Sequence, residues 1–141
     1  MRKALSVFAV LACCVCLAVV APAWAQPKVV KIGNIEPLSG SSASVGQQGK
    51  WAREMAVGEI NAAGGIKSLG GAKLELIYVD SKSDPTVGVQ ETERLINTEK
   101  VHILTGCWNS SVTYPATQIA EKYGVPFVVP VSIRDTITER G

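Results

Sequence analysis

The residues with the clearest chemical potential lie in one short loop, residues 105–111, between a predicted strand and a predicted helix. The first turn of a helix offers unpaired N–H groups and about half a positive charge, so it suits a carboxylate or another small anion. The hydroxyl groups of Ser110 and Ser111 would add donors there. Alternatively, one of the two serines only caps the helix. Asn109 precedes them, and Trp108 would either line a pocket or pack against the sheet.

Residue patterns for catalysis, metal binding and nucleotide binding are missing from the sequence. His102 is the only histidine and lies in an apolar segment, so we predict a core residue rather than a base or a ligand. Cys107 is interpreted as a small buried residue at a strand end, not as a nucleophile. The glycines between residues 40 and 49 lack the P-loop spacing, and Trp51 stands where a serine or threonine would hold magnesium. We therefore predict a protein that is not an enzyme and that carries no cofactor or metal.

The first 25 residues have the pattern of a cleavable secretory signal peptide. Arg2 and Lys3 precede an apolar run, residues 4–20, and an Ala-Trp-Ala segment follows, so we place the cleavage site after Ala25. The apolar run is short for a membrane span, which needs roughly 20 apolar residues. A lipoprotein signal ending at Cys13 is the alternative, but cleavage there would leave an apolar mature terminus.

Removal of this segment would leave a formally neutral chain with a single cysteine. The sequence has 14 Lys and Arg residues, and the loss of Arg2 and Lys3 leaves 12 of them against 12 Asp and Glu. Only Cys107 lies beyond residue 25, so no disulfide is expected within residues 26–141. Proteins that bind nucleic acid or anionic surfaces carry basic stripes, and the sequence has none. We therefore expect no nucleic-acid partner.

Residues 26–141 alternate between predicted strands and helices in the order β-α-β-α-β-α-β. The predicted strands are residues 29–35, 74–79, 101–104 and 126–129. The predicted helices are residues 44–63, closed by Gly64 and Gly65, a segment from Pro85 onward, and a third helix that Ser110 or Ser111 would cap and Gly124 would terminate. The strands are apolar on both faces, which is typical of a parallel sheet with helices on each side. The predicted fold class is therefore a doubly wound α/β sheet.

Three stripes of residues at helical spacing are predicted to face the core. The first helix would bury Ala52, Met55, Ala56, Ile60 and Ala63; the second Val89, Thr92, Leu95 and Ile96; the third Ala116, Ile119, Ala120 and Tyr123. Asp84 is expected to cap the second helix, with Pro85 at its first position. Ligands of such sheets bind beyond the carboxyl ends of the strands. The loops expected there are residues 37–45, 81–83, 106–110 and 131–135.

Several segments resemble the opening of the leucine/isoleucine/valine-binding protein family, which comprises type I periplasmic solute-binding proteins of ABC transporters. They are Pro-Leu-Ser-Gly at residues 37–40, Val45-Gly46, and Glu-Ile-Asn-Ala-Ala-Gly-Gly-Ile at residues 59–66. The likeness extends over nearly all of residues 26–141. It implies that these residues form part of the N-terminal lobe of a two-lobed receptor, which closes around a small solute and delivers it to a permease in the inner membrane.

The resemblance also implies roles for single residues. In this family the serine at the place of Ser110 binds the carboxylate of the ligand. Amino acid binders usually carry a threonine near Val131, Ser132 and Ile133, whereas Ile133 has no hydroxyl, and an aromatic residue is common at the position of Val45. An ammonium group buried without partners is costly, so these departures disfavour an α-amino acid. A less polar acid or an amide is the expected ligand.

Three classes of function remain open at this stage. The first is an extracytoplasmic receptor in the periplasm that binds a carboxylate- or amide-bearing solute, an amino acid or a related acid, in a cleft between two lobes. The same fold also serves as the sensing domain of amide- and amino-acid-responsive regulators. A secreted enzyme is the third class, but no nucleophile, base or cofactor loop supports it. A cleaved signal peptide favours the free receptor.

Overall fold

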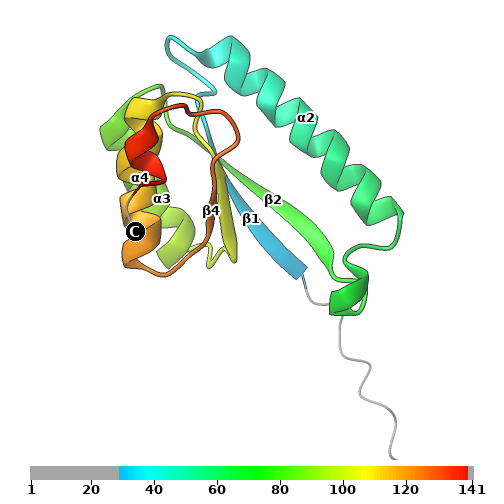
Figure 1. Ribbon diagram of the computed structural model, residues 1–141. Coiled ribbons are helices and arrows are strands. Elements are labelled where there is room, and N and C mark those ends of the chain that lie inside the picture. Colours follow the sequence, from blue (N-terminus) through cyan, green and yellow to red (C-terminus); the bar gives the residue numbers. More distant parts are fainter. Residues whose placement is uncertain (1–28, 140–141) are drawn as a thin grey trace, which may run out of the picture.

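The computed structural model describes residues 29–139, which form a four-stranded parallel sheet between helices (Figure 1). The predicted signal peptide and its cleavage site lie outside the described residues. The strands are β1 (Val29–Glu36), β2 (Lys73–Asp80), β3 (Ile103–Gly106) and β4 (Phe127–Val128). The helices are α2 (Ala43–Ala62), α3 (Pro85–Asn97) and α4 (Ser110–Lys122), with the 3-10 turns η1 (Lys67–Leu69) and η2 (Asp135–Ile137).

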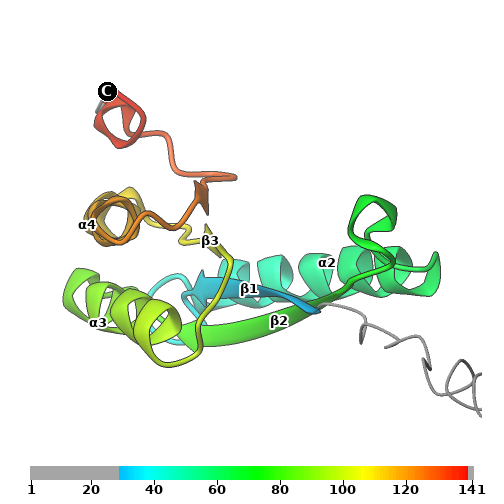
Figure 2. The same cartoon turned by 90° about the horizontal axis from the view of Figure 1, so that it is seen from below.

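The sheet has the strand order β2-β1-β3-β4, and each neighbouring pair is parallel. Helices α3 and α4 cover one face of this sheet and α2 lies on the other, as the two perpendicular views show (Figures 1 and 2). The order of elements and the parallel sheet confirm the prediction of a doubly wound α/β fold. In this order the carboxyl ends of β1, β3 and β4 come together at one edge.

The core lies between the sheet and the helices α3 and α4. Ile35 of β1, Leu104 of β3, Leu95 of α3 and Val112 of α4 are all fully buried in one cluster. The two helices approach each other closely because Gly88 has no side chain, and a Cβ at this position would overlap Val112 Cγ1. Packing on this side therefore fixes β1 and β3, the two central strands.

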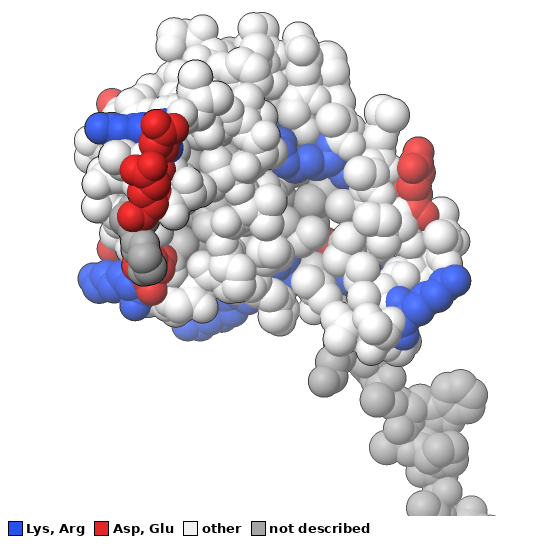
Figure 3. All heavy atoms as spheres, in the orientation of Figure 1, with Lys and Arg blue, Asp and Glu red and all other residues white. Residues whose placement is uncertain are grey.

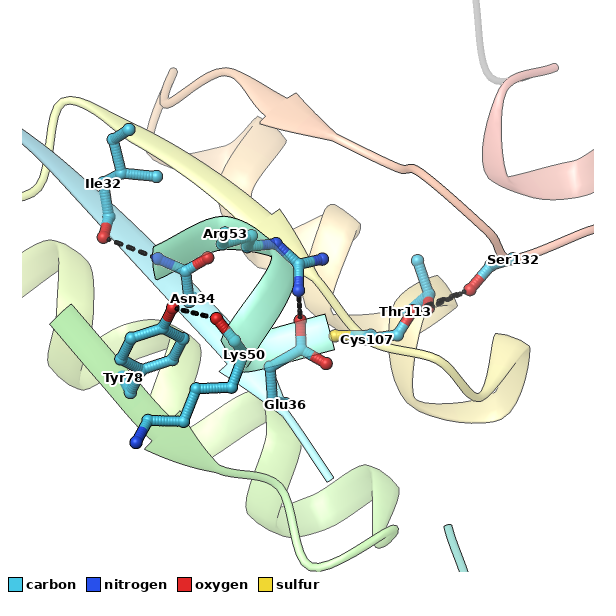
Figure 4. Close-up of polar contacts among 9 residues, drawn as sticks. All are labelled: Ile32, Asn34, Glu36, Lys50, Arg53, Tyr78, Cys107, Thr113 and Ser132. Carbon is cyan, nitrogen blue, oxygen red and sulfur yellow. Dashed lines mark hydrogen bonds and ion pairs between the residues drawn. The ribbon is translucent and has the colours of Figure 1, made fainter. Parts of the chain in front are cut away.

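Helix α2 does not bury the stripe predicted for it. Met55 is 67% exposed and Ile60 38%, and the alanines of the stripe, Ala52, Ala56 and Ala63, are exposed as well. Polar contacts tie the helix to the sheet, such as the hydrogen bond that the Tyr78 hydroxyl donates to the Lys50 carbonyl oxygen (Figure 4). The prediction was wrong because α2 lies alone on its face of the sheet, so no described element covers its apolar stripe.

Three smaller predictions are also corrected. His102 is exposed and precedes β3, and its Nδ1 accepts a hydrogen bond from the Lys31 N–H (3.0 Å). Val101 N donates to the Leu95 carbonyl oxygen, so the chain still forms a turn after α3 at this residue. Strand β3 therefore begins at Ile103, two residues later than predicted. Tyr123 is exposed at the end of α4, where Gly124 with its positive φ terminates the helix as predicted.

The start of α3 follows the prediction. The Asp84 side chain accepts hydrogen bonds from Thr86 N (2.7 Å) and Val87 N (3.0 Å), and Pro85 occupies the first position of the helix. The stripe predicted for this helix is confirmed at Thr92 as well as at Leu95 and Ile96, while Val89 is half-buried. Between residues 29 and 139, no helix is long and apolar enough to cross a membrane.

Candidate functional site

A hollow of about 280 Å³ lies at the edge of the sheet where β1, β3 and β4 end. Glu36 of β1, Cys107 after β3 and Val131 after β4 contribute to its wall, and Val45 and Arg53 of α2 close the opposite side. Two other hollows, of about 270 Å³ each, lie elsewhere: one between α4 and η2, the other between α2 and the middle of the sheet. Only the first lies at the carboxyl edge, where ligands of doubly wound sheets bind.

The structure places three of the predicted site residues on this hollow. Val45, Trp108 and Val131 line it, and Trp108 keeps nearly half of its surface exposed. The loop between β3 and α4 passes directly from Trp108 to the start of the helix, so Asn109 and Ser110 adjoin the hollow without being part of its lining. The side chains with hydrogen-bonding capacity predicted for the site therefore lie beside the hollow.

Neither serine caps α4. Asn109 is the N-cap residue, makes no capping hydrogen bond with its side chain, and the helix begins at Ser110. Instead, Asn109 Nδ2 donates to Ser42 Oγ (3.0 Å), which joins the β3–α4 loop to the start of α2. Ser110 is half-buried and Ser111 is exposed. The first turn of α4 therefore keeps its N–H groups without a side-chain cap, as a site for an anion requires.

The three predicted site residues after β4, Val131, Ser132 and Ile133, have different surroundings. Ser132 Oγ lies 2.5 Å from Thr113 Oγ1 and donates to the Cys107 carbonyl oxygen (3.1 Å), so its hydroxyl ties this segment to α4 (Figure 4). Ile133, in contrast, is 91% exposed. Of the three residues predicted at this place, Val131 faces the hollow, Ser132 is used in the scaffold and Ile133 points to solvent.

Two charged residues of the hollow were missed in the sequence analysis. Glu36 Oε1 and Arg53 Nη1 form an ion pair with a separation of 2.5 Å (Figure 4). Burial raises the pKa of Glu36, and the positive charge of Arg53 partly opposes this shift. The available signals were a carboxylate at the end of an apolar strand and an arginine beside the apolar stripe of a helix. Because these residues are 17 positions apart, no local sequence pattern indicated that they form an ion pair.

Cys107 is buried at the end of β3, which confirms its interpretation as a small core residue. Burial raises the pKa of its thiol to about 12, and the negative charge of Glu36 contributes to the shift, while a hydrogen bond with Thr113 and the charge of Arg53 act in the opposite direction. The thiolate is the nucleophilic form of cysteine, so this thiol is unreactive at neutral pH.

Asp80 positions the loop that leads into α2. Its Oδ1 accepts hydrogen bonds from Leu38 N (2.8 Å), Ser39 N (3.1 Å) and Lys82 N (2.8 Å), and its Oδ2 accepts one from the Ser39 hydroxyl (2.6 Å). Burial alone would raise the pKa of Asp80, but the hydrogen bonds from Ser39, Lys82 and Leu38 lower it below its usual value of 3.8. The carboxylate therefore clamps two loops at the carboxyl edge.

Asp80→Asn is expected to lower the free energy of unfolding at pH 7 by about 1–3 kcal/mol, because backbone N–H groups lose a charged acceptor. A lowered pKa in the folded state stabilises the protein above the unfolded pKa, and this contribution disappears as the pH falls through the folded pKa. The difference between wild type and variant, measured by urea denaturation, should therefore shrink below pH 3.8. Glu75→Gln, at an exposed site on the same strand, is the control, and a difference independent of pH would contradict the clamp.

Charge is distributed without a dominant sign over the face shown in Figure 3. Basic and acidic side chains lie there in small groups that adjoin one another at the left of the view, and no continuous basic stripe crosses this face. Within residues 29–139, no group of three or more His, Cys, Asp and Glu residues could hold a metal ion. The candidate site is thus an apolar hollow with one buried ion pair and an adjoining helix N-terminus. Such a combination suits the binding of a small organic solute.

Known proteins with similar sequences and structures are solute-binding proteins. A family model described as periplasmic binding protein matches residues 29–140. Leu/Ile/Val-binding protein homolog 2 of Brucella abortus (strain 2308) is 35% identical over 129 residues, which are 91% of this chain and 34% of that protein. The chain thus spans about a third of the length of this curated relative.

Two solved structures show the same arrangement of strands and helices. The branched-chain amino acid transporter substrate binding protein LivJ from Streptococcus pneumoniae, solved in complex with isoleucine, has a TM-score of 0.74 and 36% identity, and the match covers 79% of this chain and 31% of that one. A solute binding protein of an ABC transporter from Rhodopseudomonas palustris BisB5, solved with 3,4-dihydroxy benzoic acid, has a TM-score of 0.71 and 26% identity, over 80% of this chain and 30% of that one.

These relatives are binding proteins of transporters, in agreement with the prediction of a non-enzymatic function. The resemblance noted in the sequence extends through every described strand and helix, and the family model covers all of them. The chain therefore belongs to the periplasmic binding protein family.

Proposed function

We propose that the protein is the extracytoplasmic receptor of an ABC importer and that the hollow at the carboxyl edge forms one wall of its solute site. The observation that carries this proposal is the hollow between the ends of β1, β3 and β4, with the uncapped first turn of α4 beside it. The relatives that bind isoleucine or a dihydroxybenzoic acid support it, since both ligands carry a carboxylate. A permease in the inner membrane is the corresponding partner, and the periplasm the corresponding location.

The carboxylate or amide end of the solute is assigned to the start of α4. The N–H groups and hydroxyls of Ser110 and Ser111 are the donors, since the N–H groups of Val112 and Thr113 already donate to the Asn109 carbonyl oxygen. The helix dipole favours a negative charge there. Trp108 and Val131 supply apolar contacts on the hollow. Asn109 holds the loop in place through Ser42, so its role is to position the donors.

The segment after β4 favours an acid or amide over an α-amino acid. The Ser132 hydroxyl is used by Thr113 and the Cys107 carbonyl, and Ile133 points to solvent. Neither side chain offers an acceptor to an ammonium group in the hollow. An ammonium group left without acceptors carries a desolvation cost of several kcal/mol, which an uncharged substituent avoids.

Ser110→Ala is expected to weaken the binding of carboxylates about 10- to 100-fold, because one hydrogen bond to a charged group contributes about 1.5–3 kcal/mol. The measurement is a thermal-shift screen of the full gene product without residues 1–25, against amino acids, short amides, and aliphatic or aromatic carboxylates. A ligand that binds only the folded state raises the melting temperature, so a smaller shift in the variant reports weaker binding.

Ser68→Ala is the matched control for this experiment. Ser68 is an exposed serine in η1, which connects to the amino end of β2 at the opposite edge of the sheet, so its replacement should leave the shifts unchanged. Carboxylate binding that is equal in wild type and Ser110→Ala would contradict the assignment of α4. Shifts with branched-chain amino acids alone would contradict the preference for an acid or amide.

A further inference from the structure

The wall of the hollow contains a buried ion pair, Glu36 and Arg53, which has no role in the proposed binding of the carboxylate at the start of α4. Glu36 ends β1 and is 3% exposed, and Arg53 reaches it from α2. Apart from the ion-pair contact between Glu36 Oε1 and Arg53 Nη1, neither atom has a hydrogen-bond partner among the described residues. Buried charges are costly unless their hydrogen-bonding capacity is used. A pair with unused capacity in the wall of a hollow therefore points to a ligand.

Arg53 is the member of the pair that is more accessible to a solute. Its side chain is 20% exposed, against 4% for Glu36. A guanidinium group has five N–H donors in one plane and no acceptor. Nη1 contacts Glu36, and Figure 4 shows the other terminal nitrogen pointing away from the carboxylate. Arg53 lines both this hollow and the one between α2 and the middle of the sheet. The group presented to a solute at this wall is therefore a hydrogen-bond donor, which requires an acceptor on the ligand.

The charge balance of the pair favours an uncharged acceptor. Glu36 already compensates the charge of Arg53, and a second carboxylate beside them would place two negative groups around one guanidinium. An ammonium group would face N–H donors of the same charge. A carbonyl, carboxamide or hydroxyl oxygen accepts a hydrogen bond without adding charge, and a bond to a charged donor is stronger than one between neutral groups.

Two glycines leave the space that the pair occupies. A Cβ at Gly49 would lie 2.9 Å from Arg53 Nη1, and one at Gly106 would lie 3.0 Å from Glu36 Oε1. Around the pair the wall is mostly apolar, with Val45 of α2 among its contributors. Gln48 of α2 is the other side chain with a polar end group in this wall. A few polar groups in a mostly apolar wall fix the orientation of a solute and discriminate between solutes.

We propose that Arg53, held in place by Glu36, determines the specificity of the solute site and selects a ligand with an uncharged hydrogen-bond acceptor, such as a carboxamide oxygen, at the end opposite its carboxylate. This inference rests on the proposed function, since that function assigns the carboxylate end to α4. Glu36 acts through Arg53 as a positioning residue, because its oxygen orients the guanidinium.

The test compares two pairs of acids, each with and without an amide at the far end: benzoate with 4-carbamoylbenzoate, and butanoate with succinamate. Isothermal titration of the full gene product without residues 1–25 should show that the amide-bearing member of at least one pair binds about tenfold tighter or more. Arg53→Lys retains a positive charge beside Glu36 but lacks the planar fork of donors. This variant should lose most of the preference while its affinity for the plain acid stays within about threefold of wild type.

Arg94→Lys is the matched control, since Arg94 is exposed on α3 and pairs with Glu91 away from the hollow. If Arg53→Lys fails to fold, the double variant Glu36→Gln, Arg53→Met gives the same comparison, because it removes both charges and leaves neither unpaired. Equal binding within both pairs in wild type, or a preference that persists in the variants, would overturn the inference.

If the proposed function is wrong, the affinities of the variants follow a different pattern. Ser110→Ala should weaken both members of a pair by the same factor, whereas Arg53→Lys should weaken only the amide-bearing member. If wild type binds none of the four acids, or if Ser110→Ala leaves every affinity unchanged, the assignment of the carboxylate to α4 is wrong and the inference falls with it.

Discussion

Leu104→Ala is expected to lower the free energy of unfolding by about 3–5 kcal/mol, the upper part of the range for a large-to-small substitution in a core. Leu104 is fully buried in β3, between the two helices α3 and α4 and the central strand β1. It fits so closely that a Cβ at Gly33 would lie 2.8 Å from its Cδ2. The neighbouring strands have little freedom to collapse into the space left by three missing carbon atoms, and so the cavity persists.

Urea denaturation followed by circular dichroism measures this loss in the full gene product. Leu69→Ala is the control, since Leu69 is 51% exposed in η1 and its truncation should change stability by no more than about 0.5 kcal/mol. Equal losses for the two variants would show that Leu104 does not lie in the core described for β3.

Gly106→Ala is expected to destabilise the protein by about 2–6 kcal/mol and to distort the candidate site. Gly106 has φ of +115°, a conformation that residues with a side chain rarely adopt. An added Cβ would also overlap the Ile35 carbonyl oxygen, which accepts the hydrogen bond from Cys107 N (2.6 Å). Backbone strain and overpacking each cost about 1–3 kcal/mol. Because the overlap is with backbone, relief requires β3 to shift away from β1, next to Glu36 and the hollow.

Gly124→Ala separates the two causes of this loss. Gly124 also has a positive φ, +67°, but nothing lies within 4 Å of a Cβ at this position. Its replacement should therefore cost only the conformational strain, about 1–2 kcal/mol. Thermal denaturation compares the stability of the two variants. The affinity for a ligand found in the thermal-shift screen shows whether the hollow is distorted. A Gly106→Ala variant as stable as Gly124→Ala would contradict the close approach of β3 to β1.

The order of strands and helices was predictable because each signal is local. The helix stop at Gly64 and Gly65 and the cap at Asp84 with Pro85 depend on residues a few positions apart. The parallel sheet and its carboxyl edge follow from this order, since a strand-helix-strand unit must return to the same side. The sequence therefore predicts where the hollow lies, but not which residues form its walls.

The burial of individual residues was less predictable. The spacing of Met55 and Ile60 correctly indicates an apolar stripe on α2, but a stripe is buried only where another element covers it. The same reason applies to Ser132 and Ile133, two neighbours after β4. One lies within hydrogen-bonding distance of Thr113 on α4, and the other points to solvent.

The sequence by itself determined the fold class, the family and the loop in which Ser110 lies, because these depend on local patterns of apolar residues, glycines and prolines. Only the tertiary structure paired Glu36 with Arg53 and placed Val45, Trp108 and Val131 around one hollow. Contacts between residues far apart in the chain depend on how the strands align and how the helix lies across them. No local pattern contains that information, because the partners come together only when the sheet and its helices have packed.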